Sequence, residues 1–90
     1  MSFEVVLDKR RQKELESLDA KLKERFKQAI LVLKENPVPV EEFDVVKVSG
    51  TTNTYRIRIS THRMIYDVHW KEKRIEILQI DRKKDHSYKQ

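Results

Sequence analysis

Three arginines occupy alternating positions in two neighbouring strand-like runs of the sequence. Arg56 and Arg58 alternate with apolar residues within 54–60, and Arg63 begins a second alternating run. Because successive side chains of a strand point to opposite faces, this spacing predicts that the arginines share one face of a hairpin. Same-face residues of adjacent strands lie within roughly 5–7 Å, so their charges repel unless an anion lies between them. A guanidinium binds phosphate oxygens through paired donors, which indicates a phosphate-binding face.

The alternative is that acidic residues on the same sheet neutralise these arginines. Asp67 and Glu76 are the acids expected on the neighbouring strands. Two acids cannot balance three arginines when further basic residues follow, and these are Arg82, Lys83 and Lys84. The sequence therefore favours a positive excess on this face.

The segment after the last predicted strand adds two side chains that can move protons. Tyr88 lies near the end of the chain, and His86 precedes it by two positions. A terminal tyrosine usually packs against a neighbouring element, and a lone histidine is usually a solvated surface group. Beside several arginines, however, Tyr88 could accept a proton more readily, and His86 could do so near neutral pH.

Other kinds of site are excluded by what the sequence lacks. It contains no cysteine, which rules out disulfides, thiolate zinc sites and a cysteine nucleophile. One glycine is too few for a glycine-rich nucleotide loop. The histidines lack metal-ligand spacing, and we expect no carboxylate cluster beside them. We therefore predict no metal and no cofactor.

The distribution of charge supports a binding surface for a polyanion. The 90 residues carry a formal net charge of +5 and 39% charged residues, a length typical of one domain, 1–90. Residues 1–44 hold 9 Lys and Arg against 10 Asp and Glu, whereas 45–90 hold 11 against 5. A one-sided positive field is typical of proteins that bind phosphate backbones, although it also promotes solubility. No run approaches the ~18 apolar residues of a membrane span and no signal peptide is evident, so we expect a cytoplasmic protein with no membrane contact.

The elements that position these residues follow from the periodicity of the apolar residues. A strand at 3–7 precedes a helix at 9–18 capped by Asp8, and Asp19 caps a second helix that ends near 35, before Pro37 and Pro39. Four strand-like runs with short turns follow, at 44–48, 54–60, 63–70 and 74–80. This order predicts an α+β fold, β-α-α-β-β-β-β, in which a helical hairpin packs on one face of a twisted, mainly antiparallel sheet. We expect Phe43, Tyr66 and Trp70 in the core.

The same residues resemble the RelE branch of the RelE/ParE toxin superfamily, over about 3–88. The resemblance is carried by five segments in the family's order, and its most function-specific part is the spacing between Arg82 and Tyr88. The segments are 47–50, 55–59, 62–68, 77–82 and Tyr88.

The resemblance implies a toxin of a type II toxin–antitoxin system that cuts mRNA in the ribosomal A site. Cleavage would use the 2′-hydroxyl of the RNA as nucleophile, without metal, and leave a 2′,3′-cyclic phosphate. By position, Tyr88 matches the general base, Arg82 the general acid, and Arg63 a third catalytic residue. Arg56 and Arg58, with Arg63, match residues that hold the scissile phosphate. Further candidates for binding RNA or phosphate are Lys47, Lys83 and Lys84, and His86 is an auxiliary candidate without a fixed counterpart in the family. The implied partners are a RelB-like antitoxin, mRNA and the ribosome with its rRNA.

Three positions depart from the family's pattern, namely Ser49, His62 and Asp81. Each could weaken RNA binding or change codon preference, and Asp81 could pair with an arginine of the site. Two alternatives therefore stay open. One is a ParE-like toxin that poisons DNA gyrase, although such toxins typically lack the basic tail with its tyrosine. The other is an inactive homologue that retains only antitoxin binding.

Overall fold

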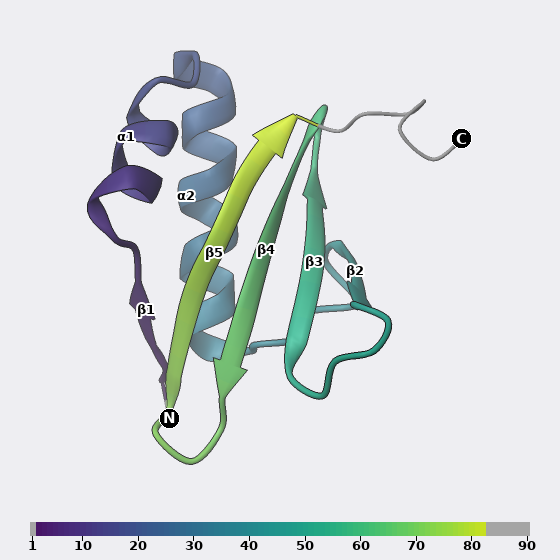
Figure 1. Ribbon diagram of the computed structural model, residues 1–90. Helices are drawn as coiled ribbons and strands as arrows, with labels where there is room; N and C mark the ends of the chain where they lie inside the picture. Colours follow the sequence, from purple (N-terminus) through teal and green to yellow (C-terminus); the bar gives the residue numbers. More distant parts are fainter. Residues whose placement is uncertain (1, 83–90) are drawn as a thin grey trace.

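The two helices begin at the aspartates that the sequence marks as caps. In the computed structural model, which describes residues 2–82, Asp8 Oδ1 accepts from the Arg11 backbone N–H at 2.8 Å, and Asp19 Oδ1 accepts from that of Leu22 at 2.9 Å. The elements are β1 (Glu4–Val6), α1 (Lys9–Glu16), α2 (Ala20–Glu35), β2 (Asp44–Lys47), β3 (Thr54–Ile59), β4 (His62–His69) and β5 (Arg74–Arg82), shown in Figure 1. The predicted α+β class and element order are confirmed. Helix α1 ends two residues earlier than predicted, where the Ser17 hydroxyl donates to the Glu14 carbonyl.

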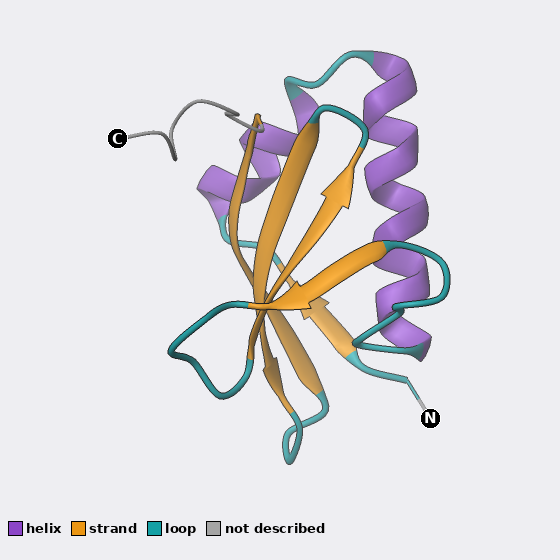
Figure 2. Ribbon diagram, turned by 90° about the vertical axis from the view of Figure 1, so that its right-hand side faces the viewer, coloured by secondary structure: helices purple, strands orange, loops and turns teal. Residues whose placement is uncertain are grey.

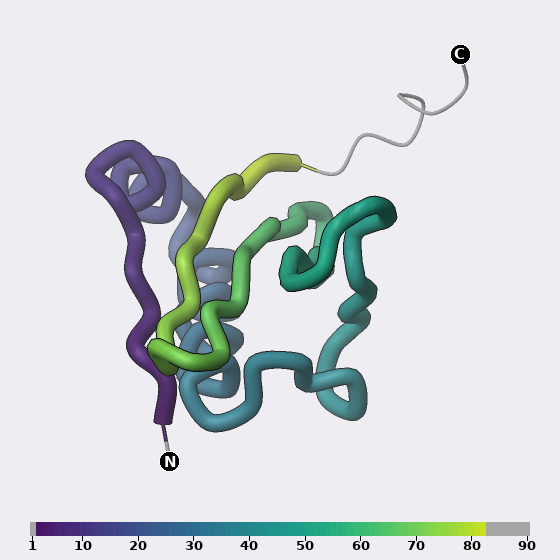
Figure 3. The backbone as a smooth tube through the Cα atoms, turned by 60° about the horizontal axis from the view of Figure 1, so that its bottom comes forward, coloured from purple at the N-terminus to yellow at the C-terminus, as the bar shows by residue number. Residues whose placement is uncertain are grey.

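The strands form one sheet in the order β1-β5-β4-β3-β2. Strand β1 runs parallel to β5, and the other neighbours are antiparallel. Figure 3 shows β1 and β5 side by side, and Figure 2 shows how far β2 turns from the direction of the other strands. The parallel pairing was not predicted, because it depends on the path of the helical hairpin between the two strands.

The hydrophobic core lies between the sheet and the helices. Helix α2, which runs behind β5 and β4 in Figure 1, contributes Phe26, Ala29 and Leu33, all fully buried. The sheet contributes alternate residues, so the strand period of two and the helix period of 3.6 both point apolar side chains inward. The buried residues of the strands are Val45, Ile57, Ile59, Met64, Tyr66, Val68, Ile75, Ile77 and Ile80. The opposite face of the sheet carries mostly polar residues, with Val46 and Ile65 among them.

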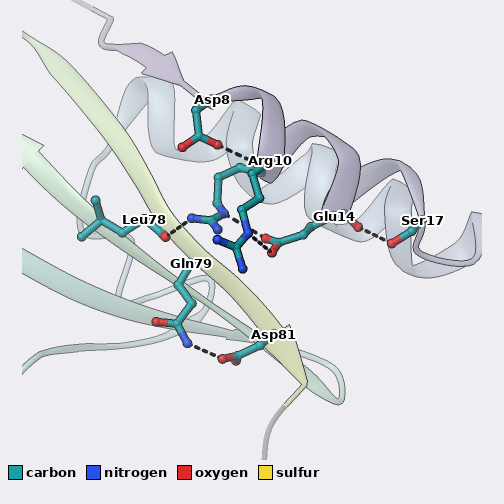
Figure 4. Close-up of polar contacts among 8 residues, drawn as sticks. Asp8, Arg10, Glu14, Ser17, Leu78, Gln79 and Asp81 are labelled. Atoms are coloured by element: carbon teal, nitrogen blue, oxygen red, sulfur yellow. Dashed lines mark hydrogen bonds and ion pairs between the residues drawn. The ribbon is translucent and has the colours of Figure 1, made fainter.

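Strand β5 contains a β-bulge at Leu78. Ile65 of β4 pairs with Gln79, whereas Tyr66 pairs with Ile77, so Leu78 has no partner across the ladder. The bulge lets Ile77 and Ile80, three residues apart, both face the core. The Leu78 carbonyl instead accepts a 2.6 Å hydrogen bond from Arg11 Nη1 of α1. In Figure 4 this bond is the dashed line that ends at the oxygen of Leu78. With the bulge, β5 extends to Arg82, two residues beyond its predicted end.

The three aromatic residues expected in the core have different environments. Tyr66 is fully buried, and its hydroxyl donates to the Pro37 carbonyl at 2.7 Å, while burial raises the pKa of the phenol far above its usual value. Phe43 packs on the core while partly exposed. Trp70 is 45% exposed and only meets the edge of Phe3, so its placement in the core was wrong. None of the helices among residues 2–82 is long and apolar enough to cross a membrane.

Candidate functional site

Four charged residues lie directly opposite one another across four strands. Asp44 of β2 pairs with Arg58 of β3, and Arg58 pairs with Arg63 of β4. Arg63 in turn pairs with Asp81 of β5. We call this line the arginine row: Asp44, Arg58, Arg63 and Asp81. Directly opposite residues share a face, and neighbours of the row such as Ile57 and Met64 are buried, so the row lies on the face away from the helices.

The predicted arginine face is therefore observed. Arg56 lies on the same face as Arg58, two residues away along β3. Arg58 and Arg63 are direct cross-strand partners, a like-charge arrangement that destabilises a sheet unless other groups compensate it.

The compensating acids are not the ones expected from the sequence. Asp44 bridges two arginines, with Oδ1 at 3.3 Å from Arg56 Nη2 and Oδ2 at 3.5 Å from Arg58 Nη1. At the other end of the row, Arg63 Nε donates to Asp81 Oδ1 at 3.0 Å. Asp81 Oδ2 also accepts from the side chain of Gln79, as Figure 4 shows. The possible interference of Asp81 noted from the sequence thus has a structural basis.

Asp67 and Glu76, the acids expected to pair with arginines, bind other residues. Asp67 accepts a hydrogen bond from the Thr54 hydroxyl, and Glu76 lies 3.3 Å from His69 Nε2. They do not neutralise the arginines, because the register places them further along β4 and β5 than the arginines.

The guanidinium groups of Arg56 and Arg58 are mostly buried, and each has a donor that lacks an acceptor among the described residues. The side chains of Arg56 and Arg58 are 18% and 34% exposed. The Nε atom of each is buried and has no hydrogen-bond partner among residues 2–82. Unsatisfied buried donors cost free energy, and in a partly desolvated site they strengthen the attraction of each cation for negative charge. The Asp44 end of the row also opens into a cleft of about 400 Å³ whose walls include Arg25 of α2 and Phe43.

Two residues of the predicted site lie on the other side of the sheet. Arg82 is directly opposite His62, and therefore on the face of Met64 rather than that of Arg63. Lys47 is opposite Tyr55, which packs against the core, and so it also faces away from the arginines. Neither side chain therefore shares a face with Arg56, Arg58 and Arg63. The remaining residues of the predicted site, Lys83, Lys84, His86 and Tyr88, lie outside the described residues.

His62 is a titratable group at the end of the sheet that carries the arginine row, where it pairs with Arg82. Its ring meets Phe26 edge-on, with centroids 6.2 Å apart, and Nδ1 lies 3.0 Å from the Thr61 hydroxyl. Burial, followed by the positive charge of Arg82, lowers the pKa of His62, so the imidazole is neutral at pH 7. The sequence identified His62 only as a departure from the family's tyrosine, and no periodicity signals its contact with α2.

A second charged group lies at the far end of the same sheet face. Asp67 and Glu76 are direct cross-strand partners, and their oxygens lie within 4.8 Å of each other and of a His69 nitrogen. The expectation that no carboxylates accompany a histidine was wrong, because pairing of β4 with β5 brings together residues distant in sequence. Such donors suit a divalent cation, but exposed groups of this kind are common without one. We assign no metal to this group, which we call the acidic end.

The chain matches known toxins along most of its length. The ParE toxin family of type II toxin–antitoxin systems, parDE, matches residues 5–86. The RelE1 protein of Methanocaldococcus jannaschii is 39% identical over 83 residues, which are 92% of each chain. The family match spans both helices, the arginine row and all of the sheet except Glu4.

Solved structures agree with the fold. RelE in the archaeal RelE–RelB complex from Pyrococcus horikoshii OT3 is 39% identical and superposes with a TM-score of 0.83, over 91% of this chain and 96% of that one. The isolated E. coli RelE toxin, at 22% identity, shares the fold with a TM-score of 0.75 over 99% and 93% of the two chains. With the family match and the two relatives at 39% identity, the chain belongs to the RelE/ParE toxin superfamily and is RelE-like within it.

Proposed function

We propose that this protein is a RelE-like endoribonuclease that cuts mRNA in the ribosomal A site and so inhibits translation in the cytoplasm. The observation that carries the proposal is the grouping of Arg56, Arg58 and Arg63 on one sheet face. Two of them are like-charge partners across strands, and two have a buried donor that no group in the described part of the chain satisfies. Such a face has a direct use in binding a phosphodiester backbone.

The proposed reaction is an attack of the RNA's own 2′-hydroxyl on the adjacent phosphorus. The 2′-oxygen–phosphorus bond forms, the phosphorus–5′-oxygen bond breaks, and a 2′,3′-cyclic phosphate remains on the upstream fragment. Negative charge builds up on the phosphoryl oxygens in the transition state, where Arg56, Arg58 and Arg63 would stabilise it. The RNA supplies the nucleophile and the arginines supply the positive charge, so the proposed chemistry requires no metal.

Two proton transfers complete the proposal, and both rest on the family resemblance. Tyr88 would accept the proton of the 2′-hydroxyl, and Arg82 would donate a proton to the leaving 5′-oxygen. Arg82 is the last residue of β5. From the end of the strand, its long side chain would have to reach around to the face that carries Arg63.

The proposed regulator is a RelB-like antitoxin, since the related RelE of P. horikoshii was solved in complex with RelB. The proposed partners besides the antitoxin are mRNA and ribosomal RNA, both polyanions that match the positive face.

The test is to map mRNA ends in a translation extract supplied with the toxin. We expect cuts at A-site codons with the wild-type protein, and strongly reduced cutting with Arg63→Gln, Arg82→Ala and Tyr88→Phe. Each variant is checked for its melting temperature. Unreduced cutting by both Arg82→Ala and Tyr88→Phe would remove these two residues from the mechanism, and absence of cutting by wild type would reject the function.

A second candidate is gyrase poisoning, favoured by the match of residues 5–86 to the ParE family. Gyrase-dependent DNA breaks without mRNA cuts in the same extract would select it. A third is an inactive antitoxin-binding homologue, favoured by the pairing of Asp81 with Arg63. Antitoxin binding without either cleavage would select that alternative.

A further inference from the structure

We infer that Asp44 and Asp81 act as internal substitutes for RNA phosphates, and that bound RNA must displace them. The inference builds on the proposed function, because it concerns how the same arginine face is occupied when no RNA is bound. It assigns to two acids of this chain a role as competitors of the substrate.

Asp44 is placed as a bridging phosphate would be. One carboxylate spans two guanidinium groups, with an oxygen directed at Arg56 and the other at Arg58. The side chain of Asp44 is 53% exposed, so it can turn into solvent without leaving a buried charge behind. The two arginines are much less exposed and would keep their positions on the rigid sheet.

Asp81 occupies the corresponding position at the other end of the row. Its carboxylate accepts from Arg63 Nε and from the Gln79 side chain, and it is 31% exposed. Because Asp81 is less exposed than Asp44 and its ion pair with Arg63 is shorter than either ion pair of Asp44, Asp81 is harder to displace. Each central arginine of the row therefore has its own acid on its outer side.

This arrangement explains how the row is stable without RNA. Arg58 and Arg63 are direct partners and repel each other, and the acids on the two outer strands offset that repulsion. A phosphodiester of the RNA backbone carries a single negative charge on two oxygens, as a carboxylate does, so it can take the place of either acid. Removing the acids should therefore lower the stability of the protein without RNA and raise its affinity for anions.

The test measures binding of a fluorescent 2′-O-methyl oligoribonucleotide, which lacks the attacking hydroxyl and stays intact. We expect Asp44→Asn to bind the oligonucleotide about threefold more tightly than wild type, and Asp81→Asn to show a larger gain in affinity. The double variant should bind about tenfold more tightly, a gain in the range that the loss of exposed to half-buried ion pairs can produce. The matched control is Glu72→Gln, which makes the same change of charge in the exposed turn between β4 and β5. It should alter affinity less than twofold.

A second measurement does not depend on RNA. In a chloride buffer, the double variant should melt at a lower temperature than wild type. When chloride is replaced by inorganic phosphate at equal ionic strength, the melting temperature of the double variant should rise more than that of wild type or of Glu72→Gln. The inference is overturned if the double variant binds the oligonucleotide no more tightly than Glu72→Gln. Weaker binding would also overturn it and would make the acids positioning residues for the arginines.

The two proposals can fail separately. If wild type cuts no mRNA but the double variant gains affinity for RNA and phosphate, the function is rejected and the inference stands. If wild type cuts mRNA but the acid variants gain no affinity, the proposed function stands and the inference about the two acids is rejected.

Discussion

The open face of the sheet has two ends with opposite charge. Each end holds a like-charge pair directly across two strands, Arg58 with Arg63 at one end and Asp67 with Glu76 at the other. The arginine pair is compensated by acids from the two outer strands. The acid pair is compensated nearby, by the Thr54 hydroxyl and by His69, which itself lies in β4.

The difference shows that a like-charge pair does not by itself define a binding site. At the acidic end, compensating groups hydrogen-bond within the cluster and leave no buried donor without a partner among the described residues. At the arginine end, the compensating acids are partly exposed, and two buried guanidinium donors are unsatisfied. The arginine end is therefore the one arranged to exchange its counter-charges for a ligand.

The largest expected effect is a difference in mRNA cleavage between a variant at the arginine end and a variant at the acidic end. Arg63→Gln removes a charge that the transition state requires, and we expect at least about a hundredfold loss of mRNA cleavage. His69→Gln at the acidic end should leave cleavage unchanged. Comparable losses in both variants, at equal melting temperatures, would contradict the assignment of function to the arginine end.

A smaller effect concerns binding alone. Arg58→Gln should weaken binding of the 2′-O-methyl oligoribonucleotide about tenfold and lower the slope of log affinity against log salt by about one. Arg74→Gln makes the same substitution on β5, opposite His69. It should change neither quantity appreciably, and an equal change of slope would show that the whole face binds RNA.

The third prediction concerns pH and the stability of the arginine end. Burial and Arg82 lower the pKa of His62 below 6.5, while Asp81 and Asp19 oppose the shift. The unfolded chain therefore binds this proton at a higher pH than the folded protein. The stability linked to neutral His62 is complete above about pH 6.5 and is lost as the pH falls through the lower, folded pKa.

Melting temperatures at pH 7.5 and 5.0 test whether stability falls on acidification because of His62. His62→Gln should show a smaller decrease on acidification than wild type. An unchanged decrease would mean that other groups carry the pH dependence.

The smallest expected effects come from the turns that close each end. Ser60, after β3, and Lys73, before β5, have φ of 58° and 56°, a left-handed conformation that costs a residue with a Cβ about 1 kcal/mol. Ser60→Gly should stabilise the protein by about 0.5–1 kcal/mol in denaturant unfolding. Lys73→Gly should gain less, because it also loses the contact of the Lys73 ammonium with Phe3 at 5.8 Å. A larger gain at Lys73 would show that this contact contributes nothing.

The sequence predicted the helices, the strands and the shared face of the three arginines, because caps and periodicity are local signals. It did not predict that Asp44 bridges Arg56 and Arg58, since that contact depends on register across the loop from 48 to 53. The roles given to Lys47 and Arg82 came from the order of residues in a family pattern. Such a pattern does not state on which side of a strand each residue lies, and both residues lie on the other side.

The bulge at Leu78 determines the composition of the arginine row. In a regular β5, Ile75 and Ile77 would share a face with Asp81, and Ile80 would lie opposite Arg63 on the other face. The additional residue shifts the phase of the strand, so that Ile80 returns to the core and Asp81 ends the row. Arg11 of α1, which binds the bulge carbonyl, thus helps to place a negative charge on the far side of the sheet. One unpaired residue puts a carboxylate instead of an isoleucine opposite Arg63, and the row is neutral overall.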